Sequence, residues 1–175
     1  PGHGGNDPGT VFGEYKEKDI NLKVALLLGD MITKNLPDVK VVYTRQTDVA
    51  VGLSDRGEIA NKAGADLFIS IHVNSVPRNS TAPSGTETFV MGPGRAEANL
   101  DIAMRENDVI SYEEDYSTKY EGYVPGSAES FIIFSLMQYA YIDQSMTMAT
   151  IMQQHYKKNS LRDRGAKQAN MNVLW

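Results

Sequence analysis

Cysteine is absent from this chain of 175 residues. Its absence excludes disulfide bonds, thiol nucleophiles and zinc sites built from cysteine. An excess of positive charge is also missing: 17 Lys and Arg stand against 22 Asp and Glu, a net charge of −5. The chain therefore lacks the basic footprint typical of nucleic-acid binding. No apolar run approaches the roughly 18 to 20 residues of a membrane span.

What the chain does contain is ordinary globular composition, with 41% hydrophobic and 22% charged residues. Apolar residues at helical spacing predict a helix from Asp19, whose side chain would cap it, to the helix breaker Pro37. The β-branched residues 39–44 predict a strand, and Ser54 is a plausible N-cap for a second helix. Residues 67–73, LFISIHV, are apolar on both faces, as expected of an inner strand of a parallel sheet.

This alternation predicts a single layered α/β domain with a mostly parallel central β-sheet flanked by helices. A further strand is expected at residues 86–91, and a long helix from Glu129 to about Lys158. A basic polar loop is expected at residues 159–168. Ligands in such sheets bind outside the carboxyl ends of the strands, and His72 lies at such an end.

Three residues are candidates for metal chemistry: His3 in a glycine-rich loop, Glu17 before the first helix, and His72. Two imidazoles and one carboxylate form a catalytic zinc set with one open position. Bound zinc lowers the pKa of water to roughly 7 and polarises a carbonyl oxygen, the two actions that amide hydrolysis needs. Spacing alone is a weak signal. A turn histidine, a solvated glutamate and a core histidine are the structural alternatives.

Six segments in one order strengthen the metal interpretation. They are PGHGGNDPGT from Pro1, EKDINLKVAL from Glu17, YTRQTD from Tyr43, LSDRGEIAN from Leu53, ADLFISIHVNS from Ala65 and RGAKQANMNVL from Arg164. Together they resemble the zinc-dependent N-acetylmuramoyl-L-alanine amidases, the cell-wall hydrolases of the AmiA, AmiB and AmiC type.

The resemblance implies that His3, Glu17 and His72 bind one Zn²⁺ ion per chain. It implies cleavage of the amide bond between N-acetylmuramic acid and L-alanine in peptidoglycan, and so a periplasmic or extracellular location. Asn74 is a possible substrate-binding residue, with a turn-forming asparagine as the alternative. The remaining histidine, His155, is interpreted as an exposed helix residue without a role.

Other charged residues of these motifs are interpreted as structural. Four of them are interpreted as members of structural ion pairs or as helix caps: Arg45, Asp48, Asp55 and Arg56. Arg164 and Lys167 are interpreted as solvated loop charges, in preference to a role in holding the loop before the last strand.

Two departures from the family pattern matter. The family carries its expected catalytic glutamate in a V-E-x-G-F type motif, which is not found in this chain, so the catalytic residue is expected beyond Trp175. We interpret the chain as trimmed at both ends. Two other functions stay open: a catalytically incomplete zinc-containing module that binds peptidoglycan or regulates its hydrolysis, and a related zinc peptidase.

The second departure is an insertion at about residues 93–130. Larger relatives carry a regulatory helix in this region that an activator protein displaces. The insertion is acidic, and four of its carboxylates are candidates for covering the metal: Glu97, Glu106, Glu113 and Glu114. A wall of the substrate groove or a dimer contact is the alternative.

Overall fold

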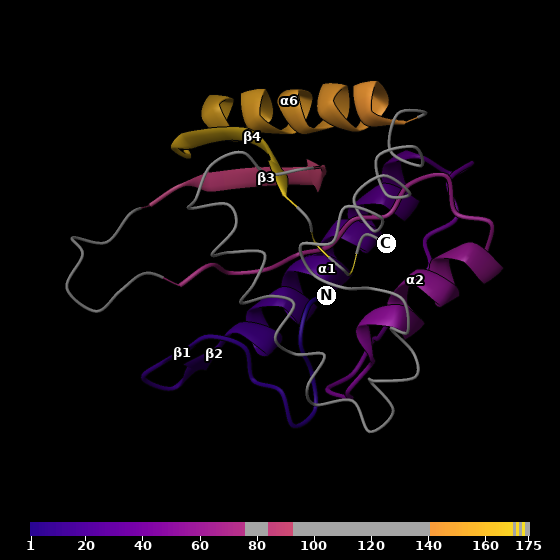
Figure 1. Ribbon diagram of the computed structural model, residues 1–175, viewed down its shortest axis with the longest axis vertical. Coiled ribbons are helices and arrows are strands. Elements are labelled where there is room, and N and C mark those ends of the chain that lie inside the picture. The colour runs from indigo at the N-terminus through magenta and orange to yellow at the C-terminus, as the bar shows by residue number, and fades with distance from the viewer. Residues whose placement is uncertain (76–83, 93–140, 170, 172, 174–175) are drawn as a thin grey trace, which may run out of the picture. The chain divides into compact units, whose positions relative to one another are not determined.

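The computed structural model describes residues 1–75, 84–92, 141–169, 171 and 173 (Figure 1). The chain divides into two compact units, one comprising Pro1–Ser75 with Asn172–Trp175 and the other Val76–Met171. The predicted insertion at 93–130 lies outside the described residues, so gating by that segment and the single-domain assignment stay predictions. No described helix is both long and apolar enough to cross a membrane.

The first helix, α1 (Glu17–Asn35), begins two residues before the predicted start. Asp19 lies in its first turn and Lys16 is the N-cap residue, so the predicted cap is wrong. The physical reason is that the preceding loop satisfies the first amides of the helix. The N–H of Glu17 donates to the carbonyl of Thr10 (2.9 Å), and that of Lys18 donates to the carbonyl of Pro8 (3.1 Å).

A small hairpin that the sequence reasoning missed leads directly into α1. Strands β1 (Val11–Phe12) and β2 (Tyr15–Lys16) pair in antiparallel fashion. Gly13 takes a left-handed conformation, with φ of 59°, in the two-residue turn. Phe12 and Tyr15 are cross-strand partners and both are exposed.

The two predicted strands of this unit do not form ladders among the described residues. Residues 39–44 and 67–73 are assigned no strand, and Leu67 is 55% exposed. An apolar pattern indicates that a segment can be buried. A strand also requires backbone hydrogen bonds to a neighbouring strand. Within the described ranges, the second segment is joined to the glycine-rich loop by a backbone hydrogen bond from the N–H of Gly2 to the carbonyl of Ile71 (3.0 Å).

Helix α2 (Leu53–Lys62) follows with Gly52 as its N-cap residue. Ser54 therefore lies in the first turn, and the predicted Ser54 cap is wrong. The side chain that α2 buries besides Leu53 is that of Arg56, which is 4% exposed. The first unit thus buries charged side chains next to its glycine-rich loop.

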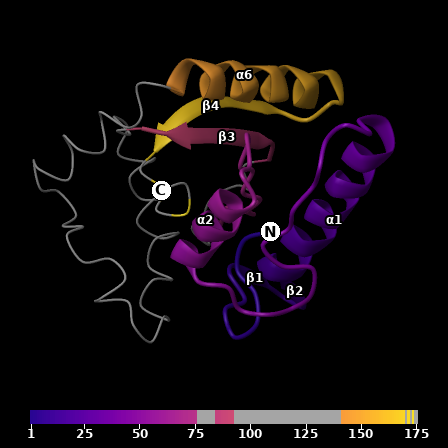
Figure 2. The ribbon, with the colours of Figure 1, turned by 90° about the vertical axis from the view of Figure 1, so that its right-hand side faces the viewer.

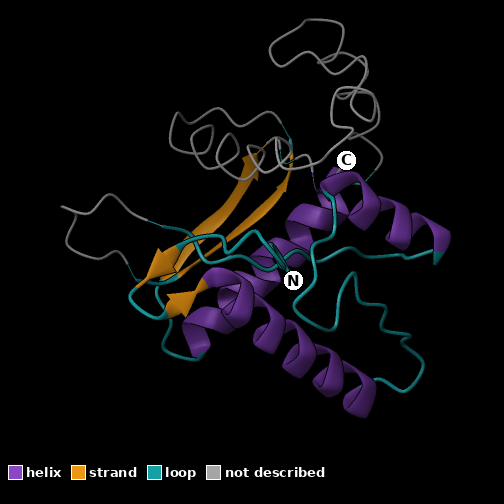
Figure 3. Ribbon diagram, turned by 90° about the horizontal axis from the view of Figure 1, so that it is seen from below, coloured by secondary structure: helices purple, strands orange, loops and turns teal. Residues whose placement is uncertain are grey.

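The second unit is built on a parallel pair of strands, β3 (Thr86–Met91) and β4 (Asp163–Ala169). β3 confirms the predicted strand, whereas β4 replaces the loop predicted at 159–168. Figure 3 shows the pair as the two longer arrows pointing the same way. Helix α6 (Ile142–Lys158) covers this pair, as Figures 1 and 2 show. The predicted long helix is therefore described only from Ile142 onward.

Polar contacts explain why β4 does not carry an obvious strand pattern. The guanidinium of Arg164 contacts Glu87 of β3 at 2.5 Å, and the amine of Lys167 contacts the same oxygen at 3.2 Å. The Glu87 side chain is only 5% exposed. The interpretation of Arg164 and Lys167 as solvated loop charges is therefore wrong. Two cations on one strand compensate a buried carboxylate on its neighbour.

Candidate metal centre

Three side chains from separate parts of the first unit converge on one point. His3 comes from the glycine-rich loop, Glu17 from the first turn of α1, and His72 from the extended segment after α2. Oε1 of Glu17 lies 3.2 Å from Nε2 of His3 and 3.0 Å from Nδ1 of His72. The two imidazole rings meet nearly edge to face, with centroids 4.8 Å apart and planes at 77°. The structure thus assembles the candidate set predicted from the sequence.

Glu17 is the most buried member of this set, with a side chain 2% exposed. Burial alone would raise the pKa of its carboxyl group. Contacts with the imidazoles of His3 and His72, followed by hydrogen bonds from the backbone N–H groups of Thr10 (2.9 Å) and Val73 (2.8 Å), outweigh burial and hold the pKa well below its usual value. Glu17 is therefore ionised, as a metal ligand requires.

The donor atoms fit a divalent metal ion. One ligand atom from each of the three residues lies within 4.8 Å of the others. Ligands about 2.0–2.1 Å from a tetrahedral ion stand roughly 3.3 Å apart, close to the 3.0 and 3.2 Å observed here. The imidazole of His3 and the ionised carboxylate of Glu17 meet favourably only with a proton or a metal cation between them. Two imidazoles and a carboxylate are also the ligand types that zinc prefers.

Glycine is required next to these side chains because the backbone and the ligands touch. A Cβ on Gly2 would lie 2.4 Å from Nε2 of His72. A Cβ on Gly9 would lie 2.6 Å from Cδ2 of His3, and φ of Gly9 is +63°. His3 itself has a φ of 55°, an uncommon conformation that the surrounding loop imposes. The glycines of the loop therefore make room for the metal ligands.

We predict that Gly2→Ala displaces the His72 ring and weakens Zn²⁺ binding about tenfold or more, as expected when a ligand loses its orientation. Gly13→Ala is the control for backbone strain without a steric clash, because its φ of +59° strains an alanine whereas its Cβ would meet nothing within 4 Å. Chelator competition measures both affinities. Equal affinity in Gly2→Ala and wild type would show that the His72 ring is free to move aside.

Two buried arginines hold the backbone of the same loop. Arg45, 3% exposed, donates to the carbonyl oxygens of Gly2 (2.9 Å) and Lys18 (2.8 Å). Arg56 donates to the carbonyl oxygen of His3 (3.1 Å). These contacts support the structural interpretation of both arginines, with backbone carbonyls among their partners. They fix the path of the chain on either side of His3.

Asp48 holds the loop from another position. Its carboxylate contacts the amine of Lys18 at 2.6 Å and accepts the N–H of Gly5 at 2.8 Å. The hydrogen bond from Lys18, followed by that from Gly5, lowers the pKa of Asp48. The structural interpretation of Asp48 is therefore supported.

A lowered pKa in the folded state means that Asp48 stabilises the protein above its unfolded pKa of about 3.9 and that this contribution is lost as the pH falls through the folded value. We predict that Asp48→Asn lowers the melting temperature of the metal-free protein at pH 7. The difference from wild type should shrink as the pH falls below about 4. Thermal unfolding followed by circular dichroism measures it, and a difference that grows toward low pH would contradict the role of Asp48.

Sequence reasoning missed two residues that contact the ligands. Asp7 lies 2.7 Å from Nδ1 of His3, and the fully buried Asn21 donates to Oε1 of Glu17 at 3.3 Å. Each lies four residues after the ligand it contacts. On α1, that spacing places Asn21 on the same helix face as Glu17, a signal available in the sequence. Asn74 is exposed, and its role in substrate binding stays a prediction.

Comparison with known proteins now identifies the family. The profile of the N-acetylmuramoyl-L-alanine amidases matches residues 1–175. The chain belongs to the N-acetylmuramoyl-L-alanine amidase family. It is 30% identical to the amidase AmiA of Escherichia coli (strain K12) over 179 aligned residues, which cover 99% of this chain and 58% of AmiA. It is 45% identical over 75 residues to the sporulation-specific amidase of Bacillus subtilis (strain 168), covering 43% of this chain and 29% of that protein.

The fold of this chain resembles that of solved amidase structures. The N-acetylmuramoyl-L-alanine amidase from Clostridium difficile 630 superposes with a TM-score of 0.64 at 27% identity, covering 99% of this chain and 69% of that one. The chain spans 29% to 31% of the length of three of the curated relatives that it matches. These likenesses confirm the α/β class for this amidase-family chain.

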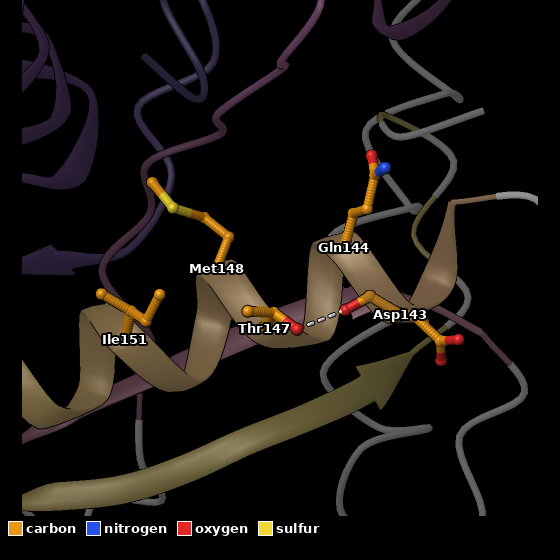
Figure 4. Close-up of a pocket in the computed structure, with 5 residues that line it drawn as sticks. All are labelled: Asp143, Gln144, Thr147, Met148 and Ile151. Atoms are coloured by element: carbon orange, nitrogen blue, oxygen red, sulfur yellow. Dashed lines mark hydrogen bonds between the residues drawn. The ribbon is translucent and has the colours of Figure 1, made fainter.

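A hollow of about 380 Å³ lies along α6 in the second unit. Figure 4 shows its lining side chains: Asp143, Gln144, Thr147, Met148 and Ile151. All five come from one helix, and none belongs to the metal-ligand set. The hydroxyl of Thr147 donates to the carbonyl oxygen of Asp143 within the helix (2.7 Å). Within the described part of the chain, the hollow therefore offers no convergent polar groups from different elements, which a ligand site requires.

Proposed function

We propose that this chain holds one Zn²⁺ ion through His3, Glu17 and His72, and that the protein hydrolyses the amide bond between N-acetylmuramic acid and L-alanine in peptidoglycan. The convergence of two imidazoles on one buried carboxylate within 4.8 Å carries the proposal. Membership of the amidase family supplies the substrate class. A bound zinc ion supplies Lewis-acid chemistry, which polarises a carbonyl oxygen and makes water more acidic.

The residues of the chain supply the positions for that chemistry. Glu17 contributes the negative charge that offsets part of the charge of a divalent ion. Its contacts with His3 and His72, and with the backbone N–H groups of Thr10 and Val73, keep both oxygens fixed. His72 is more open than the other two ligands, with a side chain 21% exposed against 6% for His3. We infer that substrate approaches from the His72 side.

Three finer assignments belong to the same proposal. The glutamate that assists proton transfer is expected beyond Trp175, where the family pattern has it. The layered domain is expected to have a mostly parallel central sheet, of which β3 and β4 are one parallel pair. A cell-wall substrate places the protein in the bacterial envelope, periplasmic or extracellular.

Digestion of purified peptidoglycan by the full native polypeptide tests the activity. Soluble products are analysed by mass spectrometry, with zinc restored and with a chelator present. We expect free stem peptides that begin with L-alanine, and their loss with the chelator. Products cut between two amino acids would favour a related zinc peptidase. Binding to the wall without any peptide release would favour the binding module.

A further inference from the structure

The imidazole of His3 has a partner on each of its two nitrogens. Nε2 lies 3.2 Å from Oε1 of Glu17, on the metal side. Nδ1 lies 2.7 Å from Oδ2 of Asp7. Asp7 thus contacts the nitrogen that does not meet Glu17, and it does not belong to the metal-ligand set of the described residues. It is an outer partner of a ligand.

Asp7 is itself held in place by two neighbouring glycines. Its Oδ1 accepts the N–H of Gly9 at 3.0 Å. Its backbone exchanges two hydrogen bonds with Gly4, at 3.0 and 3.1 Å, which close the loop around His3. The Asp7 side chain is 17% exposed. Its orientation toward His3 is therefore built into the loop.

The partners of the two Asp7 oxygens set the direction of the hydrogen bond. Oδ1 accepts the N–H of Gly9 at 3.0 Å, and Oδ2 lies 2.7 Å from Nδ1 of His3. An ionised carboxylate only accepts hydrogen bonds. Nδ1 of His3 must therefore carry the proton and donate it to Asp7.

We propose that Asp7 is the positioning residue that fixes the His3 ring as the Nδ1–H form and so presents Nε2 to the metal ion. The inference rests on the proposed zinc site. Metal-ligating histidines usually donate their other N–H to a carboxylate or carbonyl, and loss of that partner costs about 10- to 100-fold in metal affinity.

Replacement of Asp7 by asparagine removes one of the two oxygens that accept hydrogen bonds from Gly9 and His3. An amide has one oxygen, and Gly9 N–H and His3 Nδ1 compete for it. If the oxygen stays on Gly9, the NH₂ group faces Nδ1 and selects the form of His3 that carries its proton on Nε2. That proton occupies the position where the metal ion would bind. If the oxygen turns to His3 instead, two N–H groups oppose each other at Gly9.

Asp48→Asn is a matched control. Asp48 is also a carboxylate with one oxygen on the N–H of a loop glycine, Gly5, and the other on a basic side chain, Lys18. It differs in that its hydrogen bonds go to Gly5 and Lys18 and not to a candidate metal ligand. A general effect of loosening the loop would therefore appear in both variants, whereas an effect on the His3 ring should appear only in Asp7→Asn.

Two measurements on the full chain test the proposal. Competition with a chromogenic chelator gives the Zn²⁺ dissociation constants, which should rise about 10- to 100-fold for Asp7→Asn and less than about twofold for Asp48→Asn. Heteronuclear NMR of the zinc-free and zinc-loaded wild type should show the proton of neutral His3 on Nδ1. Zinc-free Asp7→Asn should show it on Nε2.

The outcomes separate this inference from the proposed function. Wild type that binds no Zn²⁺ would overturn both. Wild type that binds one Zn²⁺, with Asp7→Asn binding equally well, would overturn the role of Asp7 alone. If Asp7→Asn does not fold, the wild-type NMR spectrum still decides, because an Nδ1 of His3 that is unprotonated or bound to zinc would contradict the proposal.

Discussion

Glu17→Gln is expected to weaken Zn²⁺ binding by more than about 100-fold, beyond the loss that follows removal of an outer partner. The substitution keeps the size of the side chain but removes the charge that offsets the metal ion. It also replaces one acceptor oxygen by an NH₂ donor. Both oxygens of Glu17 accept backbone N–H groups, Oε1 that of Val73 and Oε2 that of Thr10.

The same replacement should destabilise the metal-free protein. One buried N–H then faces another donor, which costs about 1–3 kcal/mol in the free energy of unfolding. Denaturant unfolding in the presence of a chelator measures this cost separately from metal binding. Glu14→Gln is the control, because Glu14 lies exposed on the turn between β1 and β2. Tight zinc binding by Glu17→Gln would show that the carboxylate is not a ligand.

His72→Ala is expected to abolish the release of stem peptides by the native protein. It removes one of three ligands from the more open side of the site and leaves an imidazole–carboxylate pair too weak to keep the ion. The metal-free protein should keep most of its stability, because the His72 side chain is 21% exposed. Peptide release and bound zinc, measured on the same sample, should therefore fall together.

His155→Ala provides the matched histidine control. His155 lies exposed in the last turn of α6, in the second unit, and is not part of the metal-ligand set. Its removal should leave zinc content and peptide release unchanged. Equal loss of activity in His155→Ala and His72→Ala would contradict the assignment of the site.

The convergence of His3, Glu17 and His72 was predicted chiefly from the resemblance of the segments that carry them to one family, because the spacing of the three residues alone is a weak signal. His3 needs adjoining glycines for close approach, as the contacts of Gly2 and Gly9 show. Helix α2 and strand β3 were predicted from local signals, an expected capping residue at Ser54 and the short run at residues 86–91. These features depend on a few neighbouring residues, which a single sequence displays.

The features that were missed depend on tertiary contacts. The polar segment Asp163–Ala169 forms a strand because Arg164 and Lys167 contact the buried Glu87 on β3. The local sequence pattern does not predict that pairing. The start of α1 moved to Glu17 because distant loop carbonyls satisfied its first amides. The role of Asp7 depends on the ring orientation of His3, which spacing alone does not give.

Zinc K-edge X-ray absorption of the zinc-loaded protein tests the central claim most directly. The account predicts scattering from two imidazole rings and one carboxylate oxygen, with nitrogen and oxygen ligands at about 2.0–2.2 Å. It also predicts that the carboxylate and ordered imidazole contributions disappear in Glu17→Gln. A shell of oxygen ligands with fewer than two imidazoles, or the same spectrum from wild type and Glu17→Gln, would contradict the account.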